Sequence, residues 1–168
     1  MEVDENIAEV FFDLGTKQIV RIAFCQDDLR FKCTRCGTFC CKLGGPKLTK
    51  KDVERIRQAG HDLEDFLEPA VNPEFKDSPI MLGNMKNRKD GSCIFLESSS
   101  REGVYKCSIY DFRPALCRLY PFDFEKISPN SFILKFIPCC KGLNGSDGEL
   151  VDERFVTRHL LGSILEIL

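Results

Sequence analysis

Apolar residues in this chain recur in short blocks with two different spacings, which predicts a mixture of strands and helices. Residues 18–24 are apolar and β-branched, a composition typical of a strand. The segment 81–110 alternates short apolar runs with turn residues. It predicts a turn over Lys89–Gly91 and strands over Cys93–Leu96 and Val104–Tyr110, and a further strand is expected over Ser131–Ile137. From Glu149 onward, apolar residues recur at every fourth position, which predicts an amphipathic helix, at Val156, Leu160, Ile164 and Leu168.

Capping residues predict where the other helices begin and end. Thr49 is a suitable N-cap and Asp52 follows three residues later, so a helix is expected to start there and to end at Gly60. A second short helix is expected over residues 62–68, stopped by Pro69. Residues 113–119 fit one or two helical turns, with Pro114 at the first turn, where a missing N–H group costs nothing.

The combined pattern indicates a small single α+β domain, with short strands and loops around cysteine sites and helices at the periphery. The first fourteen residues fit either a short helix or a packed arm. We therefore divide the sequence into an N-terminal arm and strand (residues 1–30), a cysteine-cluster core (31–141) and a C-terminal helix packed on the same domain (142–168).

Composition limits the classes of protein to which the chain can belong. Its 168 residues are 43% apolar and include 14 phenylalanines, so a core is available and cysteines need not be the sole support of the fold. The net charge of −2 and the pI of about 5.8 give no electrostatic reason to expect a nucleic-acid partner. The start of the chain is acidic and no apolar run approaches the length of a membrane span, so we expect no membrane association and a cytoplasmic location.

The candidate chemistry lies in the cysteines, four of which fall within nine residues: Cys33, Cys36, Cys40 and Cys41. Thiolates this close in sequence cannot all pair with one another in relaxed disulfides, whereas a Cys-x2-Cys turn directs two sulfurs at one metal ion. Clustered cysteines in a reducing compartment also favour metal or redox chemistry over structural disulfides.

The remaining cysteines extend this set toward eight ligands. Cys93, Cys107 and Cys117 are spread singly, and Cys139 and Cys140 form a pair, of which we expect one ligand and one bystander. Neighbouring side chains on extended backbone point to opposite faces, so adjacent cysteines fit two neighbouring sites better than one ion. Two sites, or one polynuclear site, are therefore predicted. Cys25, in a predicted strand, is expected to fill space in the core.

No catalytic set accompanies the cysteines. His61 and His159 are expected to have packing or surface roles, and neither a phosphate-binding loop nor a Ser-His-Asp arrangement is present. Four cations flank the cysteines: Arg35, Lys42, Arg113 and Arg118. They either offset the negative charge of thiolate-rich sites or are ordinary surface charges.

At these residues the chain resembles the YkgJ-type cysteine-cluster family, whose domain is associated with zinc or iron chelation. The resemblance covers residues 31–141 and is most specific over Cys107–Phe122. The other matching segments are Phe31–Cys41, Leu48–Asp52, Gly91–Leu96 and Cys139. The chain departs from the family pattern by having three residues, where two are usual, between Cys36 and Cys40. This leaves open which of Cys40 and Cys41 takes which family role.

The resemblance implies metal or iron–sulfur binding, with ligands expected from Cys33, Cys36, Cys40, Cys41, Cys93, Cys107, Cys117 and Cys139. We favour an iron–sulfur cluster, because eight clustered thiolates exceed what a fold of this size needs for support, with Zn²⁺ as the alternative. The first hypothesis is electron transfer or partnership with a larger enzyme, with a redox protein or an enzyme as the partner. The second is a zinc-stabilised interaction module without catalysis. The third is a protein-modifying enzyme related to flagellin lysine methylases, which carry a related cysteine cluster.

Overall fold

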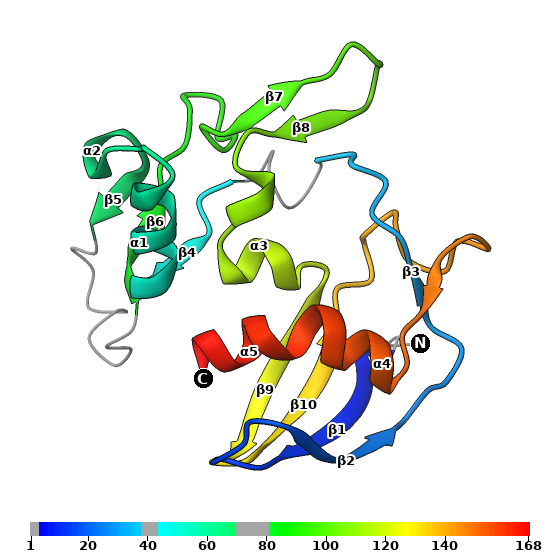
Figure 1. Cartoon of the computed structure of the whole chain (residues 1–168). Helices are drawn as coiled ribbons and strands as arrows, with labels where there is room; N and C mark the ends of the chain where they lie inside the picture. Colours follow the sequence, from blue (N-terminus) through cyan, green and yellow to red (C-terminus); the bar gives the residue numbers. More distant parts are fainter. Residues whose placement is uncertain (1–3, 38–43, 70–80) are drawn as a thin grey trace. The chain divides into compact units, whose positions relative to one another are not determined.

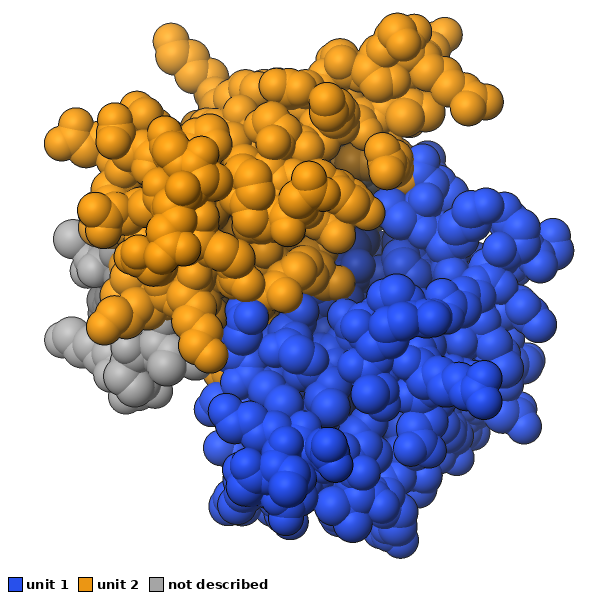
Figure 2. Space-filling view, viewed as in Figure 1, with its two compact units in different colours: residues 1–34, 119–166, 168 blue, residues 35–118, 167 orange. Residues whose placement is uncertain are grey.

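A computed structural model describes residues 4–37, 44–69 and 81–168, and these residues form two compact units (Figures 1 and 2). Unit 1 contains both ends of the chain, residues 1–34, 119–166 and 168, and unit 2 contains residues 35–118 and 167. Helices contain 24% of the residues and strands contain 34%, and the strands form small sheets. The predicted α+β class is therefore confirmed. The three-part division proposed from the sequence stays a prediction.

Unit 1 is built on a four-stranded antiparallel sheet with the order β2-β1-β10-β9. Its strands are β1 (Asn6–Phe12), β2 (Ile19–Phe24), β9 (Phe122–Ser128) and β10 (Ser131–Phe136). The register places Val10 opposite both Phe132 and Ile22. Buried residues alternate along β1 and β10, as expected for a sheet with one face against a core.

The rest of unit 1 comprises a two-stranded ladder and the C-terminal helices. The ladder pairs β3 (Arg30–Phe31) with β11 (Glu149–Leu150). Asp152 caps the helical segment by accepting the N–H of Phe155 at 2.9 Å. This segment consists of α4 (Glu153–Phe155), the π-helical turn η3 (Val156–Leu160) and α5 (Leu161–Ile167). The predicted apolar positions Val156, Leu160 and Ile164 are buried.

Unit 2 contains two small antiparallel sheets and short helices. One sheet has the order β4-β6-β5, from β4 (Lys47–Thr49), β5 (Leu67–Pro69) and β6 (Met81–Met85). The other is the hairpin of β7 (Leu96–Ser98) and β8 (Tyr105–Cys107). The helices are α1 (Lys50–Gln58), α2 (Leu63–Phe66), the 3₁₀ turn η2 (Tyr110–Phe112) and α3 (Ala115–Leu119), whose last residue belongs to unit 1.

The core of unit 2 also holds predicted ligands. Its buried residues include Leu48, Ile56, Phe66 and Cys93, and Cys107 packs against them. Two of the cysteines are therefore surrounded partly by apolar side chains.

The helix predicted at Thr49 is confirmed in detail. Thr49 accepts the N–H of Asp52 at 3.1 Å, and Asp52 accepts the N–H of Thr49 at 2.9 Å, which makes a reciprocal capping box. Gly60, with φ of +100°, follows the C-cap Ala59 and ends the helix.

Several predicted elements differ from the structure. The strand expected over Val104–Tyr110 is limited to β8, and the 3₁₀ turn η2 begins at Tyr110. The helix considered for the first fourteen residues is wrong, because Val10 and Phe12 are buried at the period of a strand and lie in β1. Residues Cys93–Leu96 form a turn, and the strand begins only at Leu96. The helix expected over 62–68 is a single turn, after which the chain extends into β5. The C-terminal helix starts at Glu153, because Glu149 and Leu150 pair with β3.

None of the helices in the described residues has the length and apolar composition needed to cross a bilayer.

Truncating Phe132 to alanine is expected to destabilise unit 1 by about 3–5 kcal/mol. The side chain is fully buried on β10, and its ring lies 6.0 Å from that of Phe12 and 5.9 Å from that of Phe124. Val20 on β2 is 72% exposed, so Val20→Ala is the matched control, with an expected change within about 0.5 kcal/mol. Urea unfolding of the two variants measures the difference. Equal midpoints would show that the buried ring does not support the sheet.

Candidate metal centre

The structure distributes the predicted cysteine ligands over both units. Cys36, Cys93, Cys107 and Cys117 belong to unit 2, and Cys33 and Cys139 belong to unit 1. Cys40 and Cys41 lie outside the described residues. Among the described residues, no three Cys, His, Asp or Glu side chains come close enough to hold a metal ion.

Cys36 is anchored to strand β8. The N–H of Tyr105 donates to the carbonyl of Arg35 at 2.9 Å, and a Cβ added to Gly37 would lie 3.3 Å from the Tyr105 ring. Arg35 and Gly37 both have positive φ, 55° and 62°, a conformation that is uncommon for arginine and readily adopted by glycine. The backbone on both sides of Cys36 is thus held against Tyr105, which precedes Cys107 by two positions in the sequence.

Two arginines meet on one tyrosine near these cysteines. The guanidinium carbon of Arg113 lies 3.8 Å from the centre of the Tyr110 ring, and that of Arg35 lies 5.2 Å from it. The Nε of Arg113 also donates to the Tyr110 carbonyl at 3.0 Å. Cation–π contacts of this kind link the Cys36 turn to the segment between Cys107 and Cys117. Arg35 and Arg113, two of the cations that flank the cysteines in the sequence, therefore pack on an aromatic ring.

Cys93 is held by a turn on one side and by the hairpin on the other. Cys93 forms an isolated antiparallel β-bridge with Asn87, and the Cys93 carbonyl accepts the N–H of Leu96 at 3.1 Å. Leu96 in turn pairs with Cys107 across β7 and β8. Cys93 is 8% exposed, whereas Cys107 is half-buried. The hairpin register therefore brings the backbones of these two predicted ligands near each other.

The turn before Cys93 matches the sequence prediction over residues 89–91. The carboxylate of Asp90 accepts the Ser92 hydroxyl at 2.6 Å and the Ser92 N–H at 3.0 Å. These hydrogen bonds lower the pKa of Asp90 below its ordinary value. The ionised Asp90 carboxylate is thereby stabilised in the turn that leads into Cys93.

Gly44 places the chain after Cys41 directly against Cys93. A Cβ at Gly44 would lie 2.6 Å from the Asn87 side-chain oxygen, 2.7 Å from the Cys93 nitrogen and 2.9 Å from the Gly91 carbonyl oxygen. Only a residue without a side chain permits this approach. The described residues that flank segment 38–43 are thus anchored at Tyr105, two residues before Cys107, and at Cys93.

Replacing Gly44 by alanine is expected to lower both stability and metal content. The added methyl group would overlap two backbone atoms, and overpacking of this kind costs about 1–3 kcal/mol. Gly103→Ala is the matched control, because Gly103 also has a positive φ, 73°, but open space around it. Thermal unfolding and metal analysis compare the two. Equal metal content in both variants would contradict a role of this contact in the metal centre.

Cys117 is carried by α3. The helix begins at Ala115, directly after Pro114, which the sequence had placed in its first turn, and the Pro114 carbonyl accepts the N–H of Arg118 at 3.0 Å. The N–H of Ala115, the first residue of α3, donates to the Asp52 carboxylate at 2.9 Å. Cys117 is half-buried.

The cysteines of unit 1 that belong to the predicted ligand set lie on either side of a tight backbone contact. The N–H of Lys32 donates to the Gly142 carbonyl at 2.9 Å, and a Cβ on Gly142 would lie 2.4 Å from the Lys32 carbonyl oxygen. Cys33 follows Lys32, and the Cys139–Cys140 pair precedes Gly142. Cys33 and Cys139 are exposed, whereas the Sγ of Cys140 accepts the Gly142 N–H at 3.4 Å. Sequence reasoning could not distinguish the pair, because this hydrogen bond depends on the turn.

The two histidines pack against aromatic rings, and Cys25 lies on the surface of unit 1. His61 packs against Phe95 at 5.0 Å between ring centres, and the partly exposed His159 packs against Phe155 at 4.8 Å, in agreement with the expected packing or surface roles. Cys25 is exposed, and the expectation that it fills space in the core is wrong because it follows the end of the edge strand β2. Lys42 lies outside the described residues.

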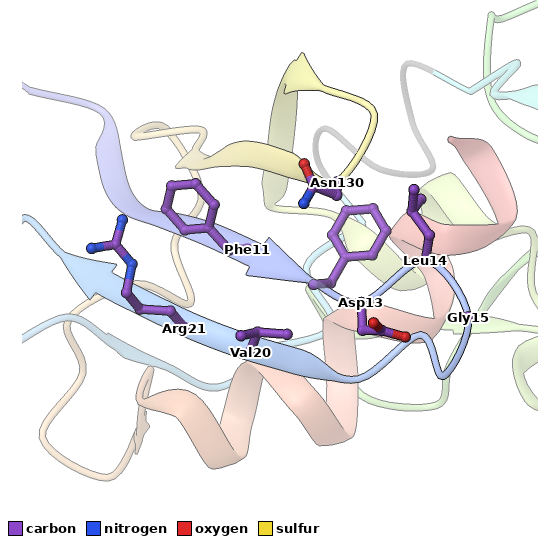
Figure 3. A pocket seen from close by; sticks show the side chains of 8 residues that line it. Phe11, Asp13, Leu14, Gly15, Val20, Arg21 and Asn130 are labelled. Atoms are coloured by element: carbon purple, nitrogen blue, oxygen red, sulfur yellow. The ribbon is translucent and has the colours of Figure 1, made fainter.

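An open pocket of about 460 Å³ lies beside the β1–β2 turn in unit 1 (Figure 3). Phe11, Val20 and Arg21 line one part of it, and the Arg21 guanidinium lies 4.4 Å from the centre of the Phe11 ring. The carboxylate of Asp13 accepts the Thr16 N–H at 2.6 Å, which lowers the pKa of Asp13. No cysteine lines this pocket, so it contributes nothing to the candidate metal centre.

Comparison with known proteins identifies the class. A family model described as "CxxCxxCC: Putative zinc- or iron-chelating domain" matches residues 32–141, most of the chain, and the chain therefore belongs to this family. It is also similar to the uncharacterized protein MJ0661 of Methanocaldococcus jannaschii, with 32% identity over 136 residues that cover 79% of this chain and 69% of the relative. No solved structure matches.

Membership of this family supports a metal cofactor, and the donor chemistry of the chain fits one. The predicted ligands are all thiols, which suit zinc, iron and iron–sulfur clusters. The amide hydrogen bond to the Cys140 sulfur is the type of contact that tunes metal-bound thiolates.

Proposed function

We propose that the chain binds an iron–sulfur cluster through its cysteines, and that it acts in electron transfer or as the partner of a larger redox enzyme. The supporting observation is the anchoring in unit 2, where Gly37 and Gly44 attach the two flanks of segment 38–43 beside Cys107 and Cys93. The sequence carries two further thiols between these flanks, Cys40 and Cys41. Together with Cys36, Cys93, Cys107 and Cys117 of unit 2, they exceed the four ligands that a single structural ion requires.

The ligands that we propose are Cys33, Cys36, Cys40, Cys41, Cys93, Cys107, Cys117 and Cys139. In this assignment the protein supplies thiolates, apolar surroundings at Cys93 and Cys107, and nearby cations at Arg35 and Arg113. When bound, the cluster would supply one-electron redox chemistry. A location in the reducing cytosol, which keeps thiols reduced, completes the proposal.

Cys140 is the alternative to Cys139 as the eighth ligand. Its sulfur accepts an amide hydrogen bond and it is less exposed than Cys139. The single variants Cys139→Ser and Cys140→Ser form a matched pair, because they change adjacent residues of the same turn. The variant that loses more bound metal identifies the ligand.

The alternative is a zinc-stabilised interaction module without catalysis. It is favoured by the position of Cys93 and Cys107 against the apolar core of unit 2, where a redox-inert ion would support packing. Its partner would be another protein, since the net charge of −2 gives no attraction for nucleic acid.

Anaerobic purification followed by metal analysis, absorption and EPR spectroscopy distinguishes the two proposals. An iron–sulfur protein is expected to be coloured and to be reduced reversibly by dithionite in a cluster-centred step. Colourless protein with stoichiometric zinc and no iron would replace the first proposal by the second. An iron-replete protein without a reversible step would remove the electron-transfer role.

A further inference from the structure

Asp52 is a buried carboxylate that bonds to more than its own helix. Its side chain is 0% exposed, yet it lies on the first turn of the otherwise amphipathic helix α1. One oxygen accepts the Thr49 N–H at 2.9 Å in the capping box. The other accepts from the Arg55 guanidinium at 2.6 Å and from the Ala115 N–H at 2.9 Å.

The bond to Ala115 has no function in capping α1. A capping box requires one bond between the N3 side chain and the N-cap amide, and Asp52 makes that bond with its Oδ2. Its Oδ1 instead receives the amide of a residue 63 positions later in the chain. Ala115 is itself fully buried, so water cannot replace this contact.

The recipient of this bond is the start of the helix that carries Cys117. The N–H of Ala115 belongs to the first turn of α3, whose N–H groups have no partner within the helix. Cys117 lies two residues further along the same turn. Fixing the Ala115 amide therefore fixes the origin of α3 and, with it, the direction in which the Cys117 sulfur is presented.

The carboxylate form is specifically required. Three N–H donors converge on Asp52, and a carboxylate offers acceptors on both oxygens. An asparagine of the same size has one acceptor and one donor group. In either orientation its NH₂ group would face at least one N–H donor, so at least one of the three bonds would be lost.

We propose that Asp52 is a positioning residue for the metal centre, and that it acts by fixing the helix that presents Cys117. This inference rests on the proposed function, since it assumes that Cys117 is a ligand. Partners outside the ligand shell typically affect metal affinity by about 10–100-fold when they are removed.

Co²⁺ titration of the full chain, anaerobic and reduced, tests the proposal, because thiolate-to-cobalt charge-transfer absorption reports ligation directly. Asp52→Asn is expected to weaken Co²⁺ binding by about 10–100-fold and to reduce the charge-transfer intensity per bound ion. Thr49→Ala is the matched variant. It removes the other half of the capping box, costs about 0.5–2 kcal/mol of stability, and leaves the Asp52–Ala115 bond in place.

Glu54→Gln provides a second control, since Glu54 is an exposed carboxylate on the same helix whose contacts are with Arg57 and Gln58. Both controls are expected to bind Co²⁺ as the wild type does. In a Cys117→Ser background, Asp52→Asn is expected to have no further effect on affinity or spectrum, because the group that it positions is absent.

The outcomes separate the two levels of inference. Equal Co²⁺ affinities and spectra for Asp52→Asn and Thr49→Ala, with a clear loss in Cys117→Ser, would overturn the role of Asp52 and leave the metal centre intact. An additive effect in the double variant would also overturn it. A wild-type chain that binds neither Co²⁺ nor a reconstituted cluster would instead overturn the proposed function.

Discussion

Removing the metal under reducing conditions is expected to lower the melting temperature of the protein by about 10–20 °C or more. Thiolate sites contribute about 10–16 kcal/mol of apparent binding free energy in small zinc peptides, whereas whole domains are stable by about 5–15 kcal/mol. A loss of only about 5 kcal/mol produces the stated shift in a chain of this size. Differential scanning calorimetry before and after exhaustive chelation measures it.

The loss of stability on metal removal is expected to affect mainly unit 2. Four of the described predicted ligands belong to this unit, and two of them pack against its core. The Phe-rich sheet of unit 1 retains its own core, including Phe132 and Leu134. Hydrogen exchange is therefore expected to accelerate in α1 and β6 more than in β1 and β10. An unchanged melting temperature after complete metal removal would contradict a structural contribution of the metal.

Serine at Cys36 or Cys117 is expected to abolish the dithionite-reducible signal of an anaerobically prepared protein. Each substitution removes one proposed thiolate from a position whose backbone is fixed, Cys36 by Tyr105 and Cys117 by the Asp52–Ala115 bond. A serine hydroxyl is a hard, protonated replacement that suits cluster iron poorly. EPR spectra of the reduced variants and their iron content measure the loss.

Cys25→Ser is the matched control for these substitutions. Cys25 is exposed and lies outside the residues 32–141 that match the family. This variant is expected to retain iron content and signal at wild-type levels. A reversible signal that persists in both the Cys36 and the Cys117 variants would mean that the ligands are assigned wrongly.

The sequence predicted well those elements whose signals are local. The Thr49 capping box, the Lys89–Gly91 turn and the buried positions of the C-terminal helix all depend on residues within a few positions of one another. The α+β class and the family followed from such local signals and from the cysteine motif.

Elements that depend on distant partners were predicted less well. β1 is the central partner of β2 and of the distant strand β10, and β11 pairs with β3, which lies more than 100 residues earlier. The same limit applies to the candidate centre. The sequence indicated which thiols to consider, but the contacts of Gly44 with Cys93 and of Asp52 with Ala115 join segments that no local pattern connects.

The division of the chain between the two units has a consequence for the order in which a nascent chain folds. The sheet of unit 1 pairs β1, near the N-terminus, with β10, which is made late, so β1 must wait with one edge unpaired while the intervening residues are synthesised. Unit 2, apart from Ile167, is contiguous over residues 35–118 and is complete before β9 has been made. The segment that carries Cys36, Cys93, Cys107 and Cys117 is therefore synthesised in full while β1 is paired with β2 alone and still lacks β10.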